Sequence, residues 1–386
     1  MTRKKKDTIQ SQAQALFLEP GLMKELFEQV VRNLLEEEVS RFLGAEPYER
    51  SSSRRGSRNG TKPRTMKTSV GELEFGVPQV REGGFRTQLF DRWQRSDKAL
   101  VAAMQEMVVK GVSTRRVSDV LEEMGGFEVS AATVSKTMSE LDASIEEFFS
   151  RKLTDARYPY LMVDARYEKV RKNGRVRTQA VLIAAGVTEQ GRRELLSVAL
   201  GDSESLDTWG ELFKDLKRRG LSGVRLLVSD AHEGIRAAFE KHFQGALWQR
   251  CRVHFMREML AKVGSKDRKE MAEDMRSIYA SDERGQCLQV AEEIADKWGR
   301  SHPKVEHALR DGVEDTLTVW DFDRRKRRKL NSTNMLERLM KEIKARTKKI
   351  GSFPNERSCW RLIGALLLET QDNWDVEPRR YIVMDD

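Results

Sequence analysis

Two aspartates each close a run of apolar residues in this chain of 386 residues. Asp164 follows the run 161–163 (LMV), and Asp230 follows the run 226–229 (LLVS). Each run predicts a buried strand, so each carboxylate is expected where a strand emerges from the core. If the two strands are neighbours, the carboxylates meet and repel each other unless a cation lies between them. Hard divalent ions such as Mg²⁺ accept such oxygen ligands, and a third carboxylate would complete a site for phosphoryl chemistry.

The third carboxylate has several candidates. They are Asp202, Glu204, Asp207, Glu233 and Glu337. Asp202 and Asp207 fit equally well as caps of a helix that begins near residue 205. Glu233 lies in a first helical turn, where the helix dipole alone favours an acid.

Glu337 differs from the other candidates in its neighbours. On a helix, Lys341, Lys344 and Lys348 follow it at i+4, i+7 and i+11, which is one face. The simpler interpretation is an ion pair between Glu337 and Lys341. The alternative is a metal ligand at the head of a lysine stripe along which a DNA strand lies.

The composition favours a polyanionic partner. Lys and Arg number 70 against 61 Asp and Glu, which gives a net charge of +9. No apolar run approaches the ~18 residues of a membrane span, so nucleic acid is favoured over a membrane. Three cysteines without a CxxC pair predict a reducing compartment, and no apolar segment follows the basic N-terminus as in a secretory signal. We therefore expect a cytoplasmic protein.

The N-terminal part is expected to be mainly helical. Residues 15–44 predict an amphipathic packing or dimerisation helix that ends at Gly44. Its apolar positions are Leu22, Leu26, Val30, Leu34 and Leu35. The polar, basic stretch 47–67 predicts a flexible arm, either a DNA-backbone contact or a solvated linker, and 70–80 predicts a short strand. Residues 98–149 predict helices, including a helix-turn-helix pattern whose second helix is capped by Ser130.

The rest of the chain predicts an α/β layer followed by helices. Strands are expected at 158–165, 176–188, 192–201 and 224–230, the first three as an antiparallel meander. Helices are expected at 205–220 and 232–243, so sheet and helices pack as layers. We divide the chain into an N-terminal helix, arm and strand (1–97), a helix-turn-helix-like region (98–150), a first catalytic part (151–254), an all-α insertion (255–325) and C-terminal helices (326–386).

Four blocks of sequence carry a resemblance to a known family. They are LMVDARYEKVR (161–171), LLVSDAHEGI (226–235), CRVHF (251–255) and STNMLERLMKEIKARTKKIGSFPN (332–355). Together they resemble the bacterial Mutator-type insertion-sequence transposases, and the resemblance runs with gaps over nearly the whole chain. One position departs from the pattern, because Met340 stands where many members carry Asn.

The resemblance implies a DDE transposase with an RNase H-like catalytic domain, in which an all-α insertion interrupts a mixed sheet of three antiparallel strands followed by parallel strands. It implies Asp164, Asp230 and Glu337 as the catalytic, metal-binding triad for two Mg²⁺ ions, with Mn²⁺ as a substitute. It implies binding to terminal inverted repeats, nicking at the 3′ ends, and joining to target DNA by transesterification. Because two DNA ends must be paired, we expect a homodimer on double-stranded DNA.

Two other functions remain open at this point. A sequence-specific DNA-binding regulator would explain the charge and the helix-turn-helix pattern, but not the aspartates that end two buried strands. An RNase H-like nuclease would cut DNA without joining it.

Cys251 and His254 match the family's Cys-x-x-His pattern, and we expect them to support the site. A zinc site is not expected, because no second pair of ligands accompanies them. The basic run 324–329 and the lysine stripe are expected to touch DNA backbone. The residues that we assign to DNA contacts are Arg171, Arg327, Arg328, Lys341, Lys344 and Lys348.

Overall fold

The computed structural model describes residues 20–49, 54–68, 71–81, 84–89, 98–125 and 129–384. The chain forms two compact units, Met1–Ser139 and Glu140–Asp386. The structure thus divides the chain inside the predicted region 98–150, rather than at either of its ends. The division falls there because α6 (Leu141–Ser150), the last helix of that region, packs on α15 (Glu356–Asp375) and so belongs to the second unit.

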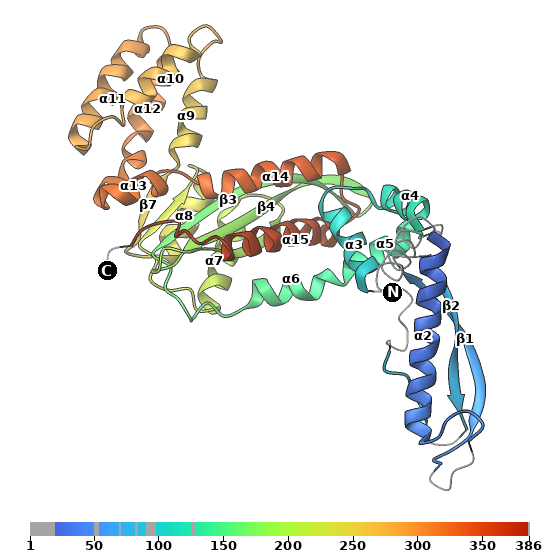
Figure 1. The fold of residues 1–386 in the computed structure, drawn as a ribbon. Helices are drawn as coiled ribbons and strands as arrows, with labels where there is room; N and C mark the ends of the chain where they lie inside the picture. The colour runs from blue at the N-terminus through green and yellow to red at the C-terminus, as the bar shows by residue number, and fades with distance from the viewer. Residues whose placement is uncertain are drawn as a thin grey trace, which may run out of the picture. The chain divides into compact units, whose positions relative to one another are not determined.

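The first part of unit 1 is a helix on a hairpin (Figure 1). Helix α2 (Pro20–Leu43) packs on the antiparallel pair β1 (Arg58–Thr68) and β2 (Gly71–Val80). Gly44 ends α2 with a φ of +65°. The prediction of a flexible arm over 47–67 is wrong from Arg58 onward, because β2 supplies the pairing partner that the polar sequence alone does not reveal.

The buried face of α2 differs from the predicted one. Val31 and Leu35 contact Met66, Leu73 and Phe75 of the hairpin in one buried cluster. The predicted apolar positions Leu26, Val30 and Leu34 are 47%, 46% and 41% exposed, and Phe27 lies beside them at 44%. Of the predicted set only Leu35 is buried, and the side chain of Leu22 lies outside the described residues. The helix has apolar residues on two faces, and the hairpin covers one of them.

Three helices complete unit 1: α3 (Lys98–Val109), α4 (Thr114–Gly125) and α5 (Ala131–Ser139). They share a small core that includes Leu100, Met104, Val117 and Val134. The side chain of Ser130 accepts a hydrogen bond from the backbone N–H of Thr133 at 3.1 Å, as a helix cap does. The two predicted helices and the Ser130 cap are therefore present.

Unit 2 is built on a mixed five-stranded sheet. Its strands are β3 (Tyr160–Lys172), β4 (Arg175–Val187), β5 (Arg193–Gly201), β6 (Leu226–Ser229) and β7 (Leu247–Arg250), in the order β5-β4-β3-β6-β7. The first three form the predicted antiparallel meander, and β6 and β7 pair in parallel. Strand β7 is absent from the sequence prediction, because its four residues show no alternation.

The prediction that Asp164 ends its strand is wrong. Strand β3 continues to Lys172, and Asp164 faces Ile183 of β4 across the hairpin. The hairpin extends because Asn173 and Gly174 have φ values of +51° and +77°, which suit a two-residue turn. The parallel partner β6, however, pairs with β3 only as far as Met162.

Helices cover the sheet (Figure 1). Helices α7 (Leu206–Arg218) and α8 (Glu233–His242) bury Trp209, Phe213 and Phe239 against the apolar strand residues. Helices α14 (Asn334–Ile350) and α15 (Glu356–Asp375) pack along β3, and α15 also packs on β5. A fully buried aromatic or aliphatic side chain contributes about 1.5–3 kcal/mol, so this apolar packing holds the strands that carry the site.

A helical insertion joins β7 to α14. It contains α9 (Arg252–Ala261), α10 (Arg268–Ser277), α11 (Arg284–Gly299), α12 (Pro303–Gly312), the short 3₁₀ helices η1 (Glu314–Thr316) and η2 (Thr318–Asp321), and α13 (Arg324–Leu330). These helices have a core of their own, with Trp298 5% exposed. In the described part of the chain, no helix combines the length and the apolar character that a bilayer span requires.

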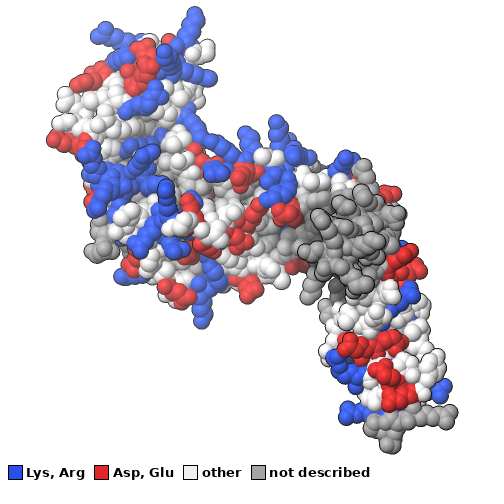
Figure 2. Space-filling view, viewed as in Figure 1, with Lys and Arg blue, Asp and Glu red and all other residues white. Residues whose placement is uncertain are grey.

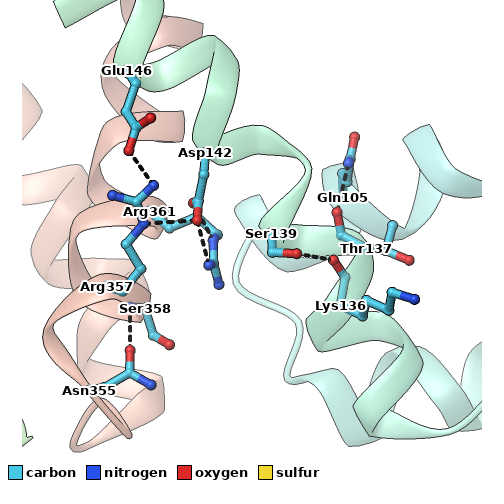
Figure 3. Close-up of polar contacts among 10 residues, drawn as sticks. All are labelled: Gln105, Lys136, Thr137, Ser139, Asp142, Glu146, Asn355, Arg357, Ser358 and Arg361. Atoms are coloured by element: carbon cyan, nitrogen blue, oxygen red, sulfur yellow. Dashed lines mark hydrogen bonds and ion pairs between the residues drawn. The ribbon is translucent and has the colours of Figure 1, made fainter.

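An ion-pair latch fastens helix α6 (Leu141–Ser150) to α15 (Figure 3). Arg361 donates to both carboxylate oxygens of Asp142 at 2.6 and 2.8 Å, and Arg357 Nε donates to the same carboxylate at 2.8 Å. Arg357 also pairs with Glu146. The hydrogen bond from Arg361 lowers the pKa of Asp142, so this group stabilises the fold above its ordinary pKa and the contribution is lost as the pH falls below it.

We predict that Asp142→Asn loosens α6. A charge-assisted hydrogen bond contributes about 1.5–3 kcal/mol, so amide hydrogen exchange in α6 should rise about 10-fold to 100-fold. Exchange mass spectrometry measures this helix by itself, which suits a chain of two units. Glu240→Gln, which removes an exposed pair with Arg236 on α8, is the control and should change exchange by less than threefold. Equal exchange in the two variants would contradict the latch.

Candidate functional site

The strand register brings Asp164 and Asp230 together. Met162 of β3 is the partner of Val228 of β6 in the parallel pair, and each aspartate follows its partner residue by two positions. Side chains two positions apart in a strand lie on the same face, so both carboxylates lie at the same point beyond the pairing. The two strands are neighbours, which is the condition that the sequence prediction set for the two carboxylates to meet.

Burial and mutual repulsion act on this pair. Asp164 is 7% exposed, and its Oδ1 accepts a hydrogen bond from the N–H of Ala165 at 3.0 Å. Burial raises the pKa of Asp164 to about 7; the positive charge of His254 lowers it, and the charge of Asp230 raises it. Asp230 is partly buried and accepts from the N–H of His232 at 3.2 Å.

Cys251 and His254 connect this pair to helix α14. Cys251 is fully buried directly after β7, and its N–H donates to Ser229 O at 2.7 Å, next to Asp230. Its thiol accepts from the N–H of Thr333 at 3.4 Å and lies 3.5 Å from the hydroxyl of Thr333. Thr333 immediately precedes α14, so the start of α14 is tied to the strand end that carries Asp230.

The positive charge of the His254 imidazole acts on both aspartates. A hydrogen bond with Cys251 raises the pKa of His254 to about 9, burial opposes the rise, and the charges of Asp164 and Asp230 add to it. Burial raises the pKa of the Cys251 thiol, but hydrogen bonds from His254 and Thr333 bring it below its ordinary value. The Cys-x-x-His pattern thus places a thiol and a charged imidazole between the aspartates and α14.

Helix α14 runs along the face of β3 that carries Asp164. Arg166 Nη1 donates to the carbonyl of Met340 at 2.9 Å, and Glu168 accepts from Thr347 Oγ1 at 2.9 Å. Asp164, two residues before Arg166, lies on the same face of β3. The two contacts show that α14 and β3 run in the same direction, so Glu337, in the first turn of α14, lies on the Asp164 side of these contacts.

The carboxylate of Glu337 has a partner of its own. Glu337 is 9% exposed, and its Oε1 lies 2.8 Å from Arg257 Nη2, in a contact that lacks the angle of a well-oriented hydrogen bond. Among the described residues, no three side chains of His, Cys, Asp or Glu are arranged to hold a metal ion. The structure therefore brings Asp164 and Asp230 together and aligns α14 beside them, while Arg257 engages the Glu337 carboxylate.

The other candidates for the third carboxylate differ in burial. Asp202, Asp207 and Glu233 are exposed, and Asp202 lies 3.3 Å from Lys172. Glu204 is 8% exposed, and its charge raises the pKa of Asp164. Glu204 lies in the connection between β5 and α7, and the sequence pattern did not separate it from its acidic neighbours.

The residues assigned to DNA contacts divide into two groups. Arg171, Arg328 and the three lysines 341, 344 and 348 are exposed, and no ion pair involves them in the described part of the chain. Arg327 is partly buried, and its guanidinium donates to the carbonyls of Trp320 and Phe322 at 3.2 and 3.0 Å. These contacts give Arg327 a role in fixing α13 to η2.

Comparisons with known proteins agree with one family. The family model described as "Transposase, Mutator family" matches residues 1–377. The chain is 43% identical over 371 residues to the transposase for insertion sequence element ISRM5 of Rhizobium meliloti, covering 96% of this chain and 93% of that relative. It is 40% identical over 367 residues to the transposase for IS406 of Burkholderia multivorans, covering 94% of each chain.

A third relative is the transposase for IS256 in transposon Tn4001 of Staphylococcus aureus, with 38% identity over 368 residues, 94% of this chain and 93% of that relative. A solved structure titled "Drosophila P element transposase strand transfer complex" overlaps with 79% of this chain and 85% of its own at 11% identity, and its TM-score of 0.32 does not establish a shared fold.

We predict that His254 titrates far above the ordinary histidine value of 6.5, near pH 9, because Cys251 and the aspartates favour its charged form. The folded state then binds this proton more tightly than the unfolded state. Its contribution to stability is complete below pH 6.5 and is lost as the pH rises through about 9.

NMR of the imidazole Cε1–H signals measures this titration. Cys251→Ala should lower the pKa of His254, and His242, whose pKa is lowered first by burial, is the internal control. A pKa of His254 at or below 6.5 would contradict this description of the site.

Proposed function

The chain belongs to the Mutator family of transposases, and we propose that it cuts and joins DNA with three carboxylates, those of Asp164, Asp230 and Glu337. One observation supports this proposal: the β3–β6 register brings Asp164 and Asp230 to the same end of two neighbouring strands, and α14, which carries Glu337 in its first turn, packs along β3. A regulator that only binds DNA has no use for a buried aspartate beside a second, partly buried aspartate that repels it. In this proposal the sheet and its helices form an RNase H-like domain.

The carboxylates fit a divalent cation. Asp164 is buried beside Asp230, and its pKa is raised first by burial and further by the charge of Asp230, so both effects penalise the bare carboxylate. Hard oxygen ligands of this kind suit Mg²⁺ or Mn²⁺. When bound, two such ions supply an activated oxygen nucleophile and stabilise the leaving oxygen. Glu337 would join the aspartates as the third ligand after release from Arg257.

The protein's own residues position the DNA strand. Lys341, Lys344 and Lys348 continue along α14 from Glu337, and Lys and Arg side chains gather over α13 and α14 (Figure 2). A strand that follows this stripe would place a phosphate at the carboxylates. His254 keeps a positive charge beside Asp164 and Asp230, and Cys251 holds the start of α14 in place.

Unit 1 would recognise the DNA ends. Helices α4 and α5 form a compact pair that fits a helix-turn-helix unit, and we propose that they bind the terminal inverted repeats. The chain would nick the 3′ ends and join them to target DNA by transesterification at the same carboxylates. Because two ends must be held together, we propose a homodimer.

The exposed apolar side chains of α2 support the homodimer. Leu26, Phe27, Val30 and Leu34 occupy one stripe and are all more than 40% exposed. A second copy of the same stripe would cover them, and each fully buried side chain would contribute about 1.5–3 kcal/mol.

We predict that Glu337→Gln abolishes catalysis and leaves DNA binding intact. Loss of an outer-shell partner already costs metal sites 10-fold to 100-fold, so loss of a ligand should lower the cleavage rate at least about 100-fold. Labelled element-end DNA, with Mg²⁺ and target DNA, reports binding, cleavage and joining in one assay. Glu342→Gln, an exposed acid on the same helix, is the control. Normal cleavage by Glu337→Gln would exclude this residue, and cleavage without joined product by the wild type would indicate a nuclease.

We also predict that Leu26→Lys combined with Val30→Lys produces a monomer, because two charges would then face the partner helix. Light scattering after size exclusion gives the mass of the protein in solution. Val383→Lys, at an apolar residue that is 65% exposed in unit 2, should leave the mass of a dimer unchanged. A dimer that survives both lysines, or a wild-type monomer on paired DNA ends, would contradict this interface.

A further inference from the structure

Glu204 is a buried acid that the triad does not use. It is 8% exposed, and its Oε2 has no hydrogen-bond partner in the described part of the structure. Tyr167, on β3, is its electrostatic neighbour, because burial and then the charge of Glu204 raise the pKa of the Tyr167 phenol. No Lys or Arg forms an ion pair with Glu204 among the described residues. A buried carboxylate with one free oxygen is costly unless it is protonated or binds a cation.

The chain connection holds Glu204 against the end of the sheet. Glu204 precedes Ser205, whose hydroxyl caps α7 by accepting from Thr208 N at 3.2 Å. Gly234, in the first turn of α8, is packed so tightly on this connection that a Cβ there would lie 2.4 Å from the Glu204 carbonyl oxygen. Helix α8 begins just after Asp230, so the backbone of Glu204 packs on a helical turn that follows Asp230 directly in the chain.

The electrostatics agree with this placement. Burial raises the pKa of Glu204, and the charge of Asp230 raises it further, while His232 and His254 lower it. The exposed acids near it behave differently, since Asp202 is 82% exposed and is paired with Lys172. Burial and an oxygen without a hydrogen-bond partner therefore distinguish Glu204 from Asp202, Asp207 and Glu233.

We propose that Glu204 is a fourth carboxylate of the site, which binds a divalent cation jointly with Asp230. In this proposal the phenol of Tyr167 would donate to one oxygen of Glu204, and the unpartnered Oε2 would bind the cation. This inference rests on the proposed function, because it adds a ligand to the same metal site. It makes Tyr167 a positioning residue, although its ring is 47% exposed on the strand that carries Asp164.

The test measures Mn²⁺ binding to the full-length, DNA-free protein, by the electron paramagnetic resonance signal of the free ion. Glu204→Gln keeps the shape of the side chain and removes its charge, and it should weaken Mn²⁺ binding on the order of 10-fold to 100-fold. Glu204→Asp should recover part of the affinity. Tyr167→Phe, which leaves the carboxylate in place, should weaken Mn²⁺ binding by a smaller factor. Element-end DNA binding should stay unchanged in all three variants.

Two reference sets separate the possible failures. Asp207→Asn and Glu233→Gln remove exposed acids from neighbouring helix starts and should leave Mn²⁺ binding unchanged. Asp164→Asn should weaken Mn²⁺ binding, as the proposed function requires.

If Asp164→Asn weakens Mn²⁺ binding while Glu204→Gln and Tyr167→Phe do not, Glu204 has no role at the metal and the proposed function stands. If Asp164→Asn has no effect either, the metal site itself is wrong. Should Glu204→Gln fail to fold, Glu204→Asp and Tyr167→Phe decide the matter.

Discussion

The parallel pairing of β3 with β6 is the constraint on which the candidate site depends, because it holds two carboxylates at the same end of the two strands. The apolar runs of β3 and β6 are fully buried and pair from Tyr160 with Leu226 to Met162 with Val228. Packing of these runs fixes the register, and the register brings Asp164 and Asp230 together. Their repulsion is not relieved by a lysine or arginine ion pair in the described part of the chain, and the charged imidazole of His254 offsets part of it. A divalent cation bound between the two carboxylates would remove the remaining repulsion.

A long helical insertion separates Asp230 from Glu337, the proposed third carboxylate. The chain leaves the sheet at Cys251, forms the helices α9 to α13, and returns at Thr333, where the Cys251 thiol meets the Thr333 backbone. The Arg252 N–H also donates to Asn331 O at 3.0 Å, so the insertion begins and ends at one place. Closing a loop of this length costs only a few kcal/mol of chain entropy, and the separate core of the insertion stabilises it. An insertion closed in this way leaves the register of α14 on β3 undisturbed.

Much of this arrangement follows from the sequence, and the exceptions have physical causes. The apolar runs before Asp164 and Asp230 predicted two buried strands, and the spacing of the lysines after Glu337 predicted a helix with one basic face; the strands and the helix are present. The extension of β3 was missed, although Asn173–Gly174 is a strong two-residue turn signal. Strand β7 and the pairing of β1 depend on partners far along the chain, which local periodicity does not report. Burial separates Glu204 from its acidic neighbours, and burial depends on the tertiary fold.

The central claim is that three carboxylates from β3, β6 and α14 converge on divalent cations. A crystal structure of the full chain with element-end DNA and Mn²⁺ tests it most directly, because anomalous scattering locates the metal. The account predicts Mn²⁺ between Asp164 and Asp230, with the Glu337 carboxylate released from Arg257 and bound to the metal. Mn²⁺ at another place in a complex that cleaves its DNA, or Glu337 still paired with Arg257 in that complex, would contradict it.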